Sequence, residues 1–352
     1  MIRTRRFPRL GWIALLLVAA LSLAACGSKP APATETAPKA SPAPAEAAKP
    51  APPAGPWEFT DDRGKKITLE KRPVRVVAQS NSAAALWDLG YEVVGVFGPQ
   101  KRADGSNDPE IGRVDLSKVT SVGEEWGKID LEKLAALRPD LIVTTMWAPP
   151  DLWYILPEVA PKVEAIAPIV GINIAKQPIT GPIKRFGELA EALGADLNAP
   201  AVVADRKRFE QASADLKAAI VAKPGLKVLF GAGSLETFWV CLPSSYADLL
   251  YFQELGMDIV VPAGAENGFV EALSWEQAQK YPADLIVYDV RAHVTQPAEL
   301  AAKIPTWNLH PAVKAGQVGR WHATASYSYK GFASILEELT ATIRSAKADV
   351  VQ

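Results

Sequence analysis

Two stretches of the chain, LEKLAALRPDLIV at residues 131–143 and WEQAQKYPADLIV at residues 275–287, align without a gap. Glu132 aligns with Glu276, 144 positions later, and both stretches end in the same DLIV. A polar, helix-like run followed by a short apolar run is typical of one helix-to-strand unit of an α/β fold. The alignment therefore predicts that one such unit occurs in each half of the chain.

A second repeated pair supports this reading. LGYEVV at residues 89–94 resembles LGMDIV at residues 255–260, and each precedes its half's DLIV stretch. Two similarities in the same order predict a duplicated architecture. Chance convergence of short α/β strings is the alternative.

Apolar, β-rich runs alternate with helical patterns from Trp57 onward, which predicts α/β layering. The predicted strands are 74–78, 93–97, 141–145 and 163–169, then 227–231, 237–242, 259–261, 285–290 and 317–321. The predicted helices are 83–89, 131–137, 152–159 and a closing helix over 331–346.

Residues 200–222 separate the two halves and carry apolar side chains along one helical face, at Val202, Phe209, Leu216 and Ile220. As a helix this segment is about 35 Å long. An ordinary amphipathic surface helix is the alternative, but its place between similar halves favours a bridge. We predict an α/β fold of two Rossmann-like lobes, 57–198 and 224–352, joined by one long backbone helix over 199–223.

The N-terminus has the features of an export signal. Basic residues precede an apolar run from Ile13 to Leu23 that is short for a membrane span. The run ends in Leu-Ala-Ala-Cys26, which resembles a bacterial lipoprotein signal whose cysteine becomes lipidated. We predict a signal peptide over 1–25 and a semi-rigid Ala/Pro-rich tether over 26–56. A soluble secreted protein is the alternative, and the Arg5-Arg6 pair leaves the export route open.

Composition excludes several functions. Lys and Arg number 38 and Asp and Glu 39, so the charge pattern for nucleic-acid binding is missing. Two cysteines and three scattered histidines are too few for a thiolate or histidine metal cage. Cys241 is expected to be a buried free thiol. Neither a G-x-S-x-G elbow nor an H-E-x-x-H motif occurs, so a hydrolase is a remote alternative.

Ligands of open α/β sheets bind beyond the carboxyl ends of the strands, so the loops there are the candidate site. Trp147 and Arg291 occupy matching positions after the repeated strands. The ten tryptophans are a second signal, although core packing accounts for many of them. Aromatic faces with few charges suit a bulky ligand that is neutral or cationic. The predicted cleft residues are Asn81, Arg102, Trp126, Trp147, Trp239, Arg291, Tyr327 and Tyr329.

The aligned glutamates, Glu132 and Glu276, each occupy the second position of a predicted helix. Asp130 is a suitable N-cap, and Ser274 with Gln277 fits a capping box. A carboxylate there gains from the helix dipole, which is a sufficient structural role. Alternatively, one acidic group on each lobe forms a docking surface for a two-fold symmetric basic partner.

At these residues the chain resembles class III periplasmic binding proteins, the ferric-siderophore and cobalamin receptors of ATP-driven importers. The resemblance rests on residues 129–143, 274–287 and 307–316. It implies a monomer whose lobes open little, no enzymatic activity and no cofactor, with iron carried by the siderophore. It also implies that Glu132 and Glu276 contact arginines of the permease, which works with an ATPase. Lipidated Cys26 would hold the protein at the outer face of the cytoplasmic membrane or in the periplasm.

The resemblance also bears on the ligand. Ferric catecholates are strongly anionic and usually meet several basic residues, whereas this cleft has Arg291 and Arg102. We therefore expect a ferric hydroxamate. The arginine that hydroxamate binders of this family use before the first matched helix is replaced by Glu124, Glu125 and Trp126. Cobalamin remains an alternative, and so does haem because of Tyr327 and Tyr329.

Overall fold

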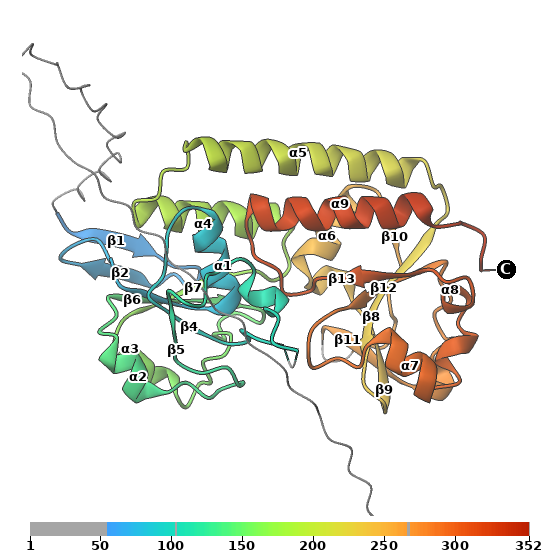
Figure 1. The fold of residues 1–352 in the computed structure, drawn as a ribbon, viewed down its shortest axis with the longest axis horizontal. Helices are drawn as coiled ribbons and strands as arrows, with labels where there is room; N and C mark the ends of the chain where they lie inside the picture. The colour runs from blue at the N-terminus through green and yellow to red at the C-terminus, as the bar shows by residue number, and fades with distance from the viewer. Residues whose placement is uncertain (1–54, 103, 266–267, 352) are drawn as a thin grey trace, which may run out of the picture. The chain divides into compact units, whose positions relative to one another are not determined.

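The first lobe is built on a five-stranded sheet whose strands are all parallel (Figure 1). Its elements are β1 Trp57–Thr60, β2 Lys66–Leu69, β3 Val76–Gln79, α1 Ser80–Asp88, β4 Gly95–Phe97, η1 Pro109–Ile111, β5 Thr120–Ser121, α2 Leu131–Ala136, β6 Leu141–Met146, α3 Ala160–Glu164, β7 Ile169–Asn173 and α4 Thr180–Ala192. The strand order is β5-β4-β3-β6-β7, and β1 and β2 form a separate hairpin.

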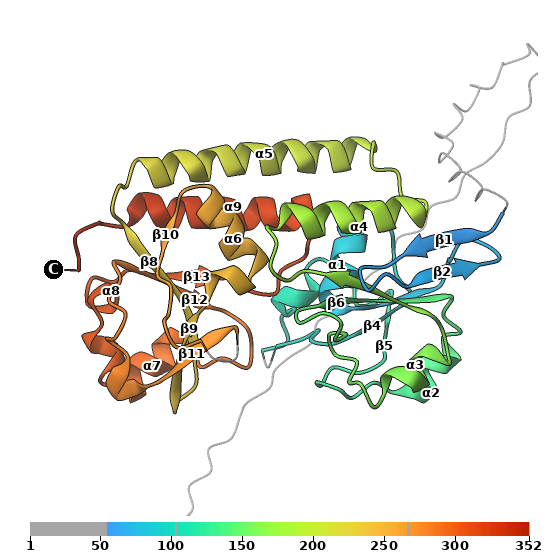
Figure 2. The ribbon, with the colours of Figure 1, turned by 180° about the vertical axis from the view of Figure 1, so that it is seen from behind.

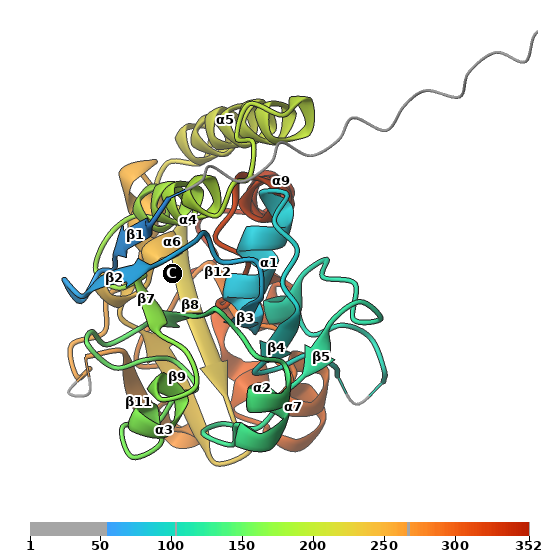
Figure 3. The ribbon, with the colours of Figure 1, turned by 90° about the vertical axis from the view of Figure 1, so that its left-hand side faces the viewer.

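The second lobe has a six-stranded sheet that combines a parallel part with an antiparallel edge. Its elements, after the helix α5 Pro200–Val221, are β8 Lys227–Gly233, β9 Thr237–Cys241, η2 Pro243–Ser245, α6 Ala247–Glu254, β10 Asp258–Ile259, β11 Val270–Ser274, η3 Trp275–Gln277, β12 Leu285–Asp289, α7 Pro297–Lys303, η4 Trp307–Leu309, α8 Pro311–Lys314, β13 Val318–Trp321 and α9 Tyr329–Ser345. The order is β11-β9-β8-β12-β13, with β10 paired to β8. Helices lie on both sides of the strands (Figure 3).

This computed structural model describes residues 55–102, 104–265 and 268–351. The predicted signal peptide, Cys26 and all but the last two residues of the predicted tether lie outside the described residues. The predicted fold class, two α/β lobes joined by one long helix, is confirmed.

The repeated DLIV stretches occupy equivalent places in the two sheets. β6 lies between β3 and β7, and β12 lies between β8 and β13. The repeated aspartates also act alike. Asp140 exchanges hydrogen bonds with the backbone of Arg75, and Asp284 does so with Lys227, each through its own N–H and one carboxylate oxygen at 2.8–2.9 Å. The repeat therefore fixes where each pair of central strands begins.

The bridging helix is confirmed as α5, which runs across both lobes above α9 (Figures 1 and 2). Its 22 residues make a rod of about 33 Å. Phe209 on its inner face packs against Tyr251 of α6 and Tyr329 of α9, with ring centroids 5.9 and 5.5 Å apart. Neither α5 nor any other helix in the described parts of the chain is both long and apolar enough to cross a membrane.

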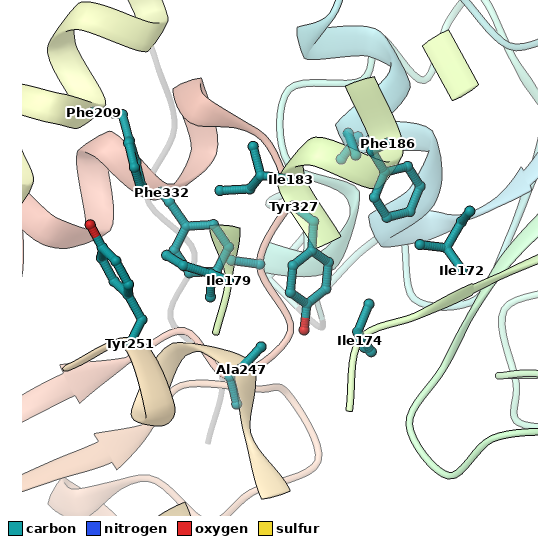
Figure 4. Close-up of a cluster of buried hydrophobic side chains, with 14 of the residues drawn as sticks. Ile172, Ile174, Ile179, Ile183, Phe186, Phe209, Ala247, Tyr251, Tyr327 and Phe332 are labelled. Carbon is teal, nitrogen blue, oxygen red and sulfur yellow. The ribbon is translucent and has the colours of Figure 1, made fainter. Parts of the chain in front are cut away.

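One apolar core continues from lobe to lobe beneath these helices (Figure 4). Tyr327, just before α9, lies at its centre and is 3% exposed. Its ring stacks on Phe186 of α4 at 6.4 Å and packs against Phe332 of α9 at 5.8 Å. The Ile179 N–H donates to the Ala247 carbonyl across the same junction at 3.0 Å. Separating the lobes here would expose apolar surface, which opposes wide opening.

Two secondary-structure predictions were wrong. The predicted strand 163–169 contains the end of α3, and the strand β7 begins only at Ile169. The predicted helix 152–159 is an irregular segment in which Tyr154 has a positive φ of 65°. Pro157 within that stretch has no N–H to donate and disfavours a helical residue before it. The helix was predicted from the spacing of apolar residues alone, without regard to this proline.

The duplicated aspartates give a stability prediction. Asp284 is buried and also accepts from Val350 and Val351 at 2.8 and 2.9 Å, whereas the donors to the Asp140 carboxylate among the described residues are Val74 and Arg75. Asp284→Ala should therefore lower the free energy of unfolding by about 2–4 kcal/mol and Asp140→Ala by about 1–2 kcal/mol. Urea unfolding measures both.

Asp258→Ala, at an exposed aspartate of β10, is the control and should change the free energy of unfolding little. Equal, small losses for all three variants would contradict the proposed strand-anchoring role.

Candidate ligand-binding site

A cavity of about 370 Å³ lies at the junction of the two lobes. The first lobe lines it with Trp126 and residues of the segment 147–157, which follows β6. The second lobe contributes Tyr246, Phe269 and Arg291, the last of which follows β12. The cavity therefore lies beyond the carboxyl ends of the two repeated strands, where α/β folds bind ligands. Its volume is in the range of small-molecule sites.

Aromatic rings form a continuous chain through this cavity from one lobe to the other. Trp126 meets Trp153 edge-on with ring centroids 4.6 Å apart, and Trp153 lies 5.6 Å from Trp147. Trp147 then contacts Tyr246 of the second lobe at 5.8 Å, and Tyr246 contacts Trp321 at 5.1 Å. These rings lie within the range of favourable aromatic pairing. They present a preformed apolar wall.

The cavity grades from an exposed mouth to a buried floor. Trp126 is 50% exposed, whereas Trp147 is 7% exposed. The indole N–H groups of Trp147 and Trp153 are buried without a hydrogen-bond partner among the described residues. Such donors are rarely left unpaired, which is consistent with a site where a ligand or water supplies acceptors.

A second hollow of about 400 Å³ adjoins the cavity and shares Trp147, Ala148 and Phe269 with it. It adds Asn173, the last residue of β7, and Lys176 from the segment that follows β7. The two hollows together extend the room available to a ligand on either side of Trp147.

Arg291 carries the positive charge of the cavity lining, but its charge is compensated within the protein. Its Nε and Nη2 atoms contact one oxygen of Asp289 at 2.7 and 2.6 Å, and its backbone N–H donates to the other. Burial acts to lower the pKa of Arg291, but the fully buried Asp289 carboxylate outweighs burial and raises that pKa. Arg291 is thus a fixed polar group with little net charge to offer.

Three of the predicted cleft residues, Trp126, Trp147 and Arg291, come together in the cavity lining. The counterparts Trp147 and Arg291 reach it from opposite lobes.

The other three predicted aromatic residues have different positions. Tyr327 lies in the core between the lobes, and Tyr329 contacts Phe209 on α5. Trp239 is half-buried on β9 and packs against the second lobe's own core. None of the three is among the described residues that line the cavity. As predicted, Trp239 lies in a strand and the two tyrosines follow one. The ring of each, however, packs against apolar side chains and not into the cavity.

Asn81 and Arg102 also lie away from the cavity lining. Asn81 is fully buried in the first turn of α1, where its amide oxygen faces the Thr145 hydroxyl at 3.5 Å. Arg102 lines a separate groove and donates from Nη2 to the Val290 carbonyl of the other lobe at 2.9 Å. It connects the lobes beside the site.

Trp153, Tyr246, Phe269 and Asp151 line the cavity but were not predicted from the sequence. Trp153 lies in the segment 152–159 that was predicted to be a helix, and Asp151 directly precedes that segment. Prolines before and after it were the available signal for an exposed loop. Tyr246 and Phe269 have no local signal, because only the arrangement of the lobes brings them to Trp147.

A buried carboxylate lies close behind the site. Glu110 of η1 is 3% exposed and accepts a hydrogen bond from the Gln79 side chain at 2.7 Å. Burial raises its pKa to about 7, and the nearby Asp108 acts in the same direction. Arg291 and Thr324 of the second lobe act to lower the same pKa, so the pKa of Glu110 depends on residues of both lobes.

The aligned glutamates are both exposed, at the second position of α2 and of the single-turn helix η3. Asp130 caps α2 as predicted, accepting from the Lys133 N–H at 2.9 Å. The predicted capping box at Ser274 was wrong, because that hydroxyl makes no cap hydrogen bond. A hydrogen bond from Ser274 instead lowers the pKa of Glu276. Each lobe thus presents one exposed carboxylate at the matching position.

The prediction for Cys241 is confirmed, since it is a buried free thiol. Burial raises its pKa, which makes the thiolate scarce. Within the described residues, no group of three or more His, Cys, Asp and Glu side chains is placed to hold a metal ion.

The family model described as "Periplasmic binding protein" matches residues 76–325. The chain belongs to this family. The match spans both lobes and α5, and the resemblance inferred from the repeated stretches is confirmed. Periplasmic binding proteins are exported binding proteins, which agrees with the predicted export and with a role other than catalysis.

Two similar proteins have closely related descriptions. The Fe(3+)-citrate-binding protein YfmC of Bacillus subtilis is 27% identical over 261 residues, covering 73% of this chain and 76% of that protein. The crystal structure of DesE, a ferric-siderophore receptor protein from Streptomyces coelicolor, is 42% identical with a TM-score of 0.80. That match covers 83% of this chain and 99% of DesE.

The siderophore binding protein FhuD from Vibrio cholerae, solved with Fe3+-Desferal bound, has a TM-score of 0.54 at 20% identity. The match covers 77% of this chain and 98% of FhuD, and it supports the fold alone.

Glu110 gives a pH prediction. Its carboxyl keeps its proton up to about pH 7 in the folded state but ionises near its ordinary pKa of 4.5 in the unfolded chain. Stability is therefore lost as pH rises from 4.5 to 7, by an amount on the order of 3 kcal/mol. Glu110→Gln should remove this loss, so its unfolding free energy relative to wild type should rise between pH 4.5 and pH 8.

Urea unfolding at both pH values measures the effect, with Glu191→Gln at an exposed site of α4 as the matched control. If the stability of Glu110→Gln relative to wild type did not depend on pH, the buried, protonated carboxyl would be the wrong description.

Proposed function

We propose that this protein is the substrate-binding component of an ABC importer that captures a ferric siderophore, most consistently of the hydroxamate type. It delivers this cargo to a permease and its ATPase, and it does no chemistry on the ligand. The observation that carries the proposal is an aromatic cavity between two lobes of a periplasmic binding protein, in which Arg291, the one cation among the described lining residues, is already paired.

The charge of the cavity favours the hydroxamate class. Three monoanionic hydroxamates balance Fe3+, so the ferric core of such a complex is neutral. Its carbon chains suit aromatic walls, and its outward oxygens can accept from buried indole N–H groups such as that of Trp147. Strongly anionic complexes would require cations to offset their loss of hydration. The pairing of Arg291 with Asp289 leaves little such charge here.

The same geometry weighs against the alternatives. Citrate, named for YfmC, and catecholates form anionic ferric complexes. Among the described residues that line the main cavity the one cation, Arg291, is already paired, and Lys176 lines the adjoining hollow instead. The tyrosines that kept haem open, Tyr327 and Tyr329, lie outside the cavity lining. Cobalamin is larger than the main cavity and would have to occupy the adjoining hollow as well. We therefore propose a ferric hydroxamate as the ligand.

Docking to the permease is proposed to use Glu132 and Glu276. Their matching positions on two similar lobes provide the paired acidic groups that a two-fold basic partner requires. The protein is proposed to act as a monomer held to the membrane through lipidated Cys26. The Ala/Pro-rich tether would then separate the folded lobes from the membrane surface.

Ligand class is tested by quenching of tryptophan fluorescence with ferric Desferal, ferrichrome, ferric citrate, a ferric catecholate, haem and cobalamin. The two hydroxamates should quench at micromolar concentrations or below, and the others weakly. Trp147→Ala should weaken hydroxamate binding about tenfold or more, because its ring joins the two walls.

Trp87→Phe, on α1 outside the cavity lining, and Tyr327→Phe in the core are matched controls that should keep wild-type affinity. Tighter binding of an anionic complex, haem or cobalamin would overturn the hydroxamate assignment. Absence of binding by every compound in the panel would overturn the transport proposal.

The docking proposal is tested with the double variant Glu132→Arg/Glu276→Arg. Ligand affinity should stay within about twofold of wild type, since both side chains are exposed and outside the cavity lining. Uptake of radiolabelled iron by cells should be lost, because like charges would face the basic partner. Glu191→Arg/Glu254→Arg, at exposed positions of α4 and α6, is the control. Normal uptake by the docking variant would overturn the docking proposal and leave the aligned glutamates with a structural role at helix termini.

A further inference from the structure

The two charged side chains that line the cavity, among the residues that the structure describes, differ because one is paired within the protein and the other is not. Of the described residues that line it, Asp151 and Arg291 are charged. Arg291 is held by the fully buried Asp289 through contacts of 2.6 and 2.7 Å. Asp151 is therefore the lining charge that the protein leaves uncompensated.

Asp151 is exposed and lies in the loop after β6. Its backbone N–H donates to the Ala148 carbonyl at 2.9 Å, which holds the turn. Its carboxylate has neither a salt bridge nor a side-chain hydrogen bond to any residue in the described ranges. It is available to a ligand without first breaking a contact within the protein.

Further negative charge lies behind this side of the cavity. Tyr154, three residues after Asp151, has its pKa raised first by burial, then by Glu110 where that carboxyl is ionised, above about pH 7, and by the Asp108 carboxylate. Arg291 opposes this effect. At the Asp151 side of the cavity the field therefore favours a positive group on the ligand, whereas the adjoining hollow holds the cation Lys176.

An aromatic face accompanies the carboxylate at the mouth. Trp126 lines the same cavity and is 50% exposed, and its ring packs against Trp153, two residues after Asp151. A carboxylate and an exposed indole that line the same cavity attract an alkylammonium by charge and by the electron-rich ring face.

We propose that Asp151 and Trp126 form a subsite for a protonated primary amine on the ligand. The inference rests on the proposed function and narrows it: the preferred cargo is a ferric hydroxamate with a cationic, amine-bearing end. The neutral ferric core occupies the aromatic cavity, while the ammonium group lies at the mouth, where it keeps part of its hydration.

The test compares ferric Desferal, which carries one free primary amine, with its N-acetylated form, which lacks only that charge. Wild-type protein should bind the acetylated complex about three- to tenfold more weakly, the range expected for a partly exposed ion pair with a cation–π contact. Asp151→Asn should lose the same factor toward ferric Desferal and nothing toward the acetylated complex. Raising the salt concentration should reduce the difference.

Glu158→Gln is the matched control, because it removes one exposed carboxylate from the same segment outside the cavity lining. It should leave both affinities unchanged, and circular dichroism should confirm that both variants are folded. Equal affinity of wild type for the two complexes would overturn the subsite and leave the proposed function standing. Equal weakening of both by Asp151→Asn would also overturn the subsite. Failure of wild type to bind either complex would overturn the proposed function itself.

Discussion

The continuous apolar contact between the lobes is the constraint on which the other features depend. Tyr327 from the second lobe stacks on Phe186 of the first, and α5 and α9 cover this junction from above (Figures 1 and 4). Wide separation would expose these rings to water, which costs free energy in proportion to the apolar area exposed. The lobes consequently hold the walls of the cavity near their final positions. A preformed site of this kind loses less conformational freedom when a ligand binds.

The aromatic chain extends this packing from the core into the cavity. Trp321 is buried, Tyr246 connects it to Trp147 at the floor, and Trp126 ends the chain in solvent. The charges follow a similar division. Deep in the site, Arg291 is neutralised by Asp289, while the carboxylate of the exposed Asp151 has no partner among the residues that the structure describes. Shape and charge therefore act together: the floor suits a neutral, largely apolar body, and the exposed mouth suits polar groups that stay near water.

Many of the helices and strands were predictable because they depend on local sequence patterns. The repeated DLIV stretches placed β6 and β12, and the spacing of apolar residues in 200–222 placed α5. Trp147 and Arg291 were predictable for the same reason, since each follows a repeated strand. The segment 152–159 was not, because its apolar spacing imitates a helix and Pro157 was given too little weight. Tyr327 and Trp239 were assigned to the cleft from position, although side-chain direction decides whether a ring lines a cavity or a core.

The sequence by itself determined the two-lobe α/β architecture, the bridging helix, the membership in the periplasmic binding proteins and the two opposed residues Trp147 and Arg291. The architecture, the helix and the two opposed residues follow from periodicity and repetition, which depend on neighbours along the chain. The membership follows from the resemblance of residues 129–143, 274–287 and 307–316 to that family and from the family match. Only the tertiary structure decided that Tyr246 and Phe269 meet Trp147, that Asp289 cancels the charge of Arg291, and that Asp151 is left uncompensated. Those facts depend on distances between residues far apart in sequence, and charge balance in a cavity is a property of the groups that folding brings together.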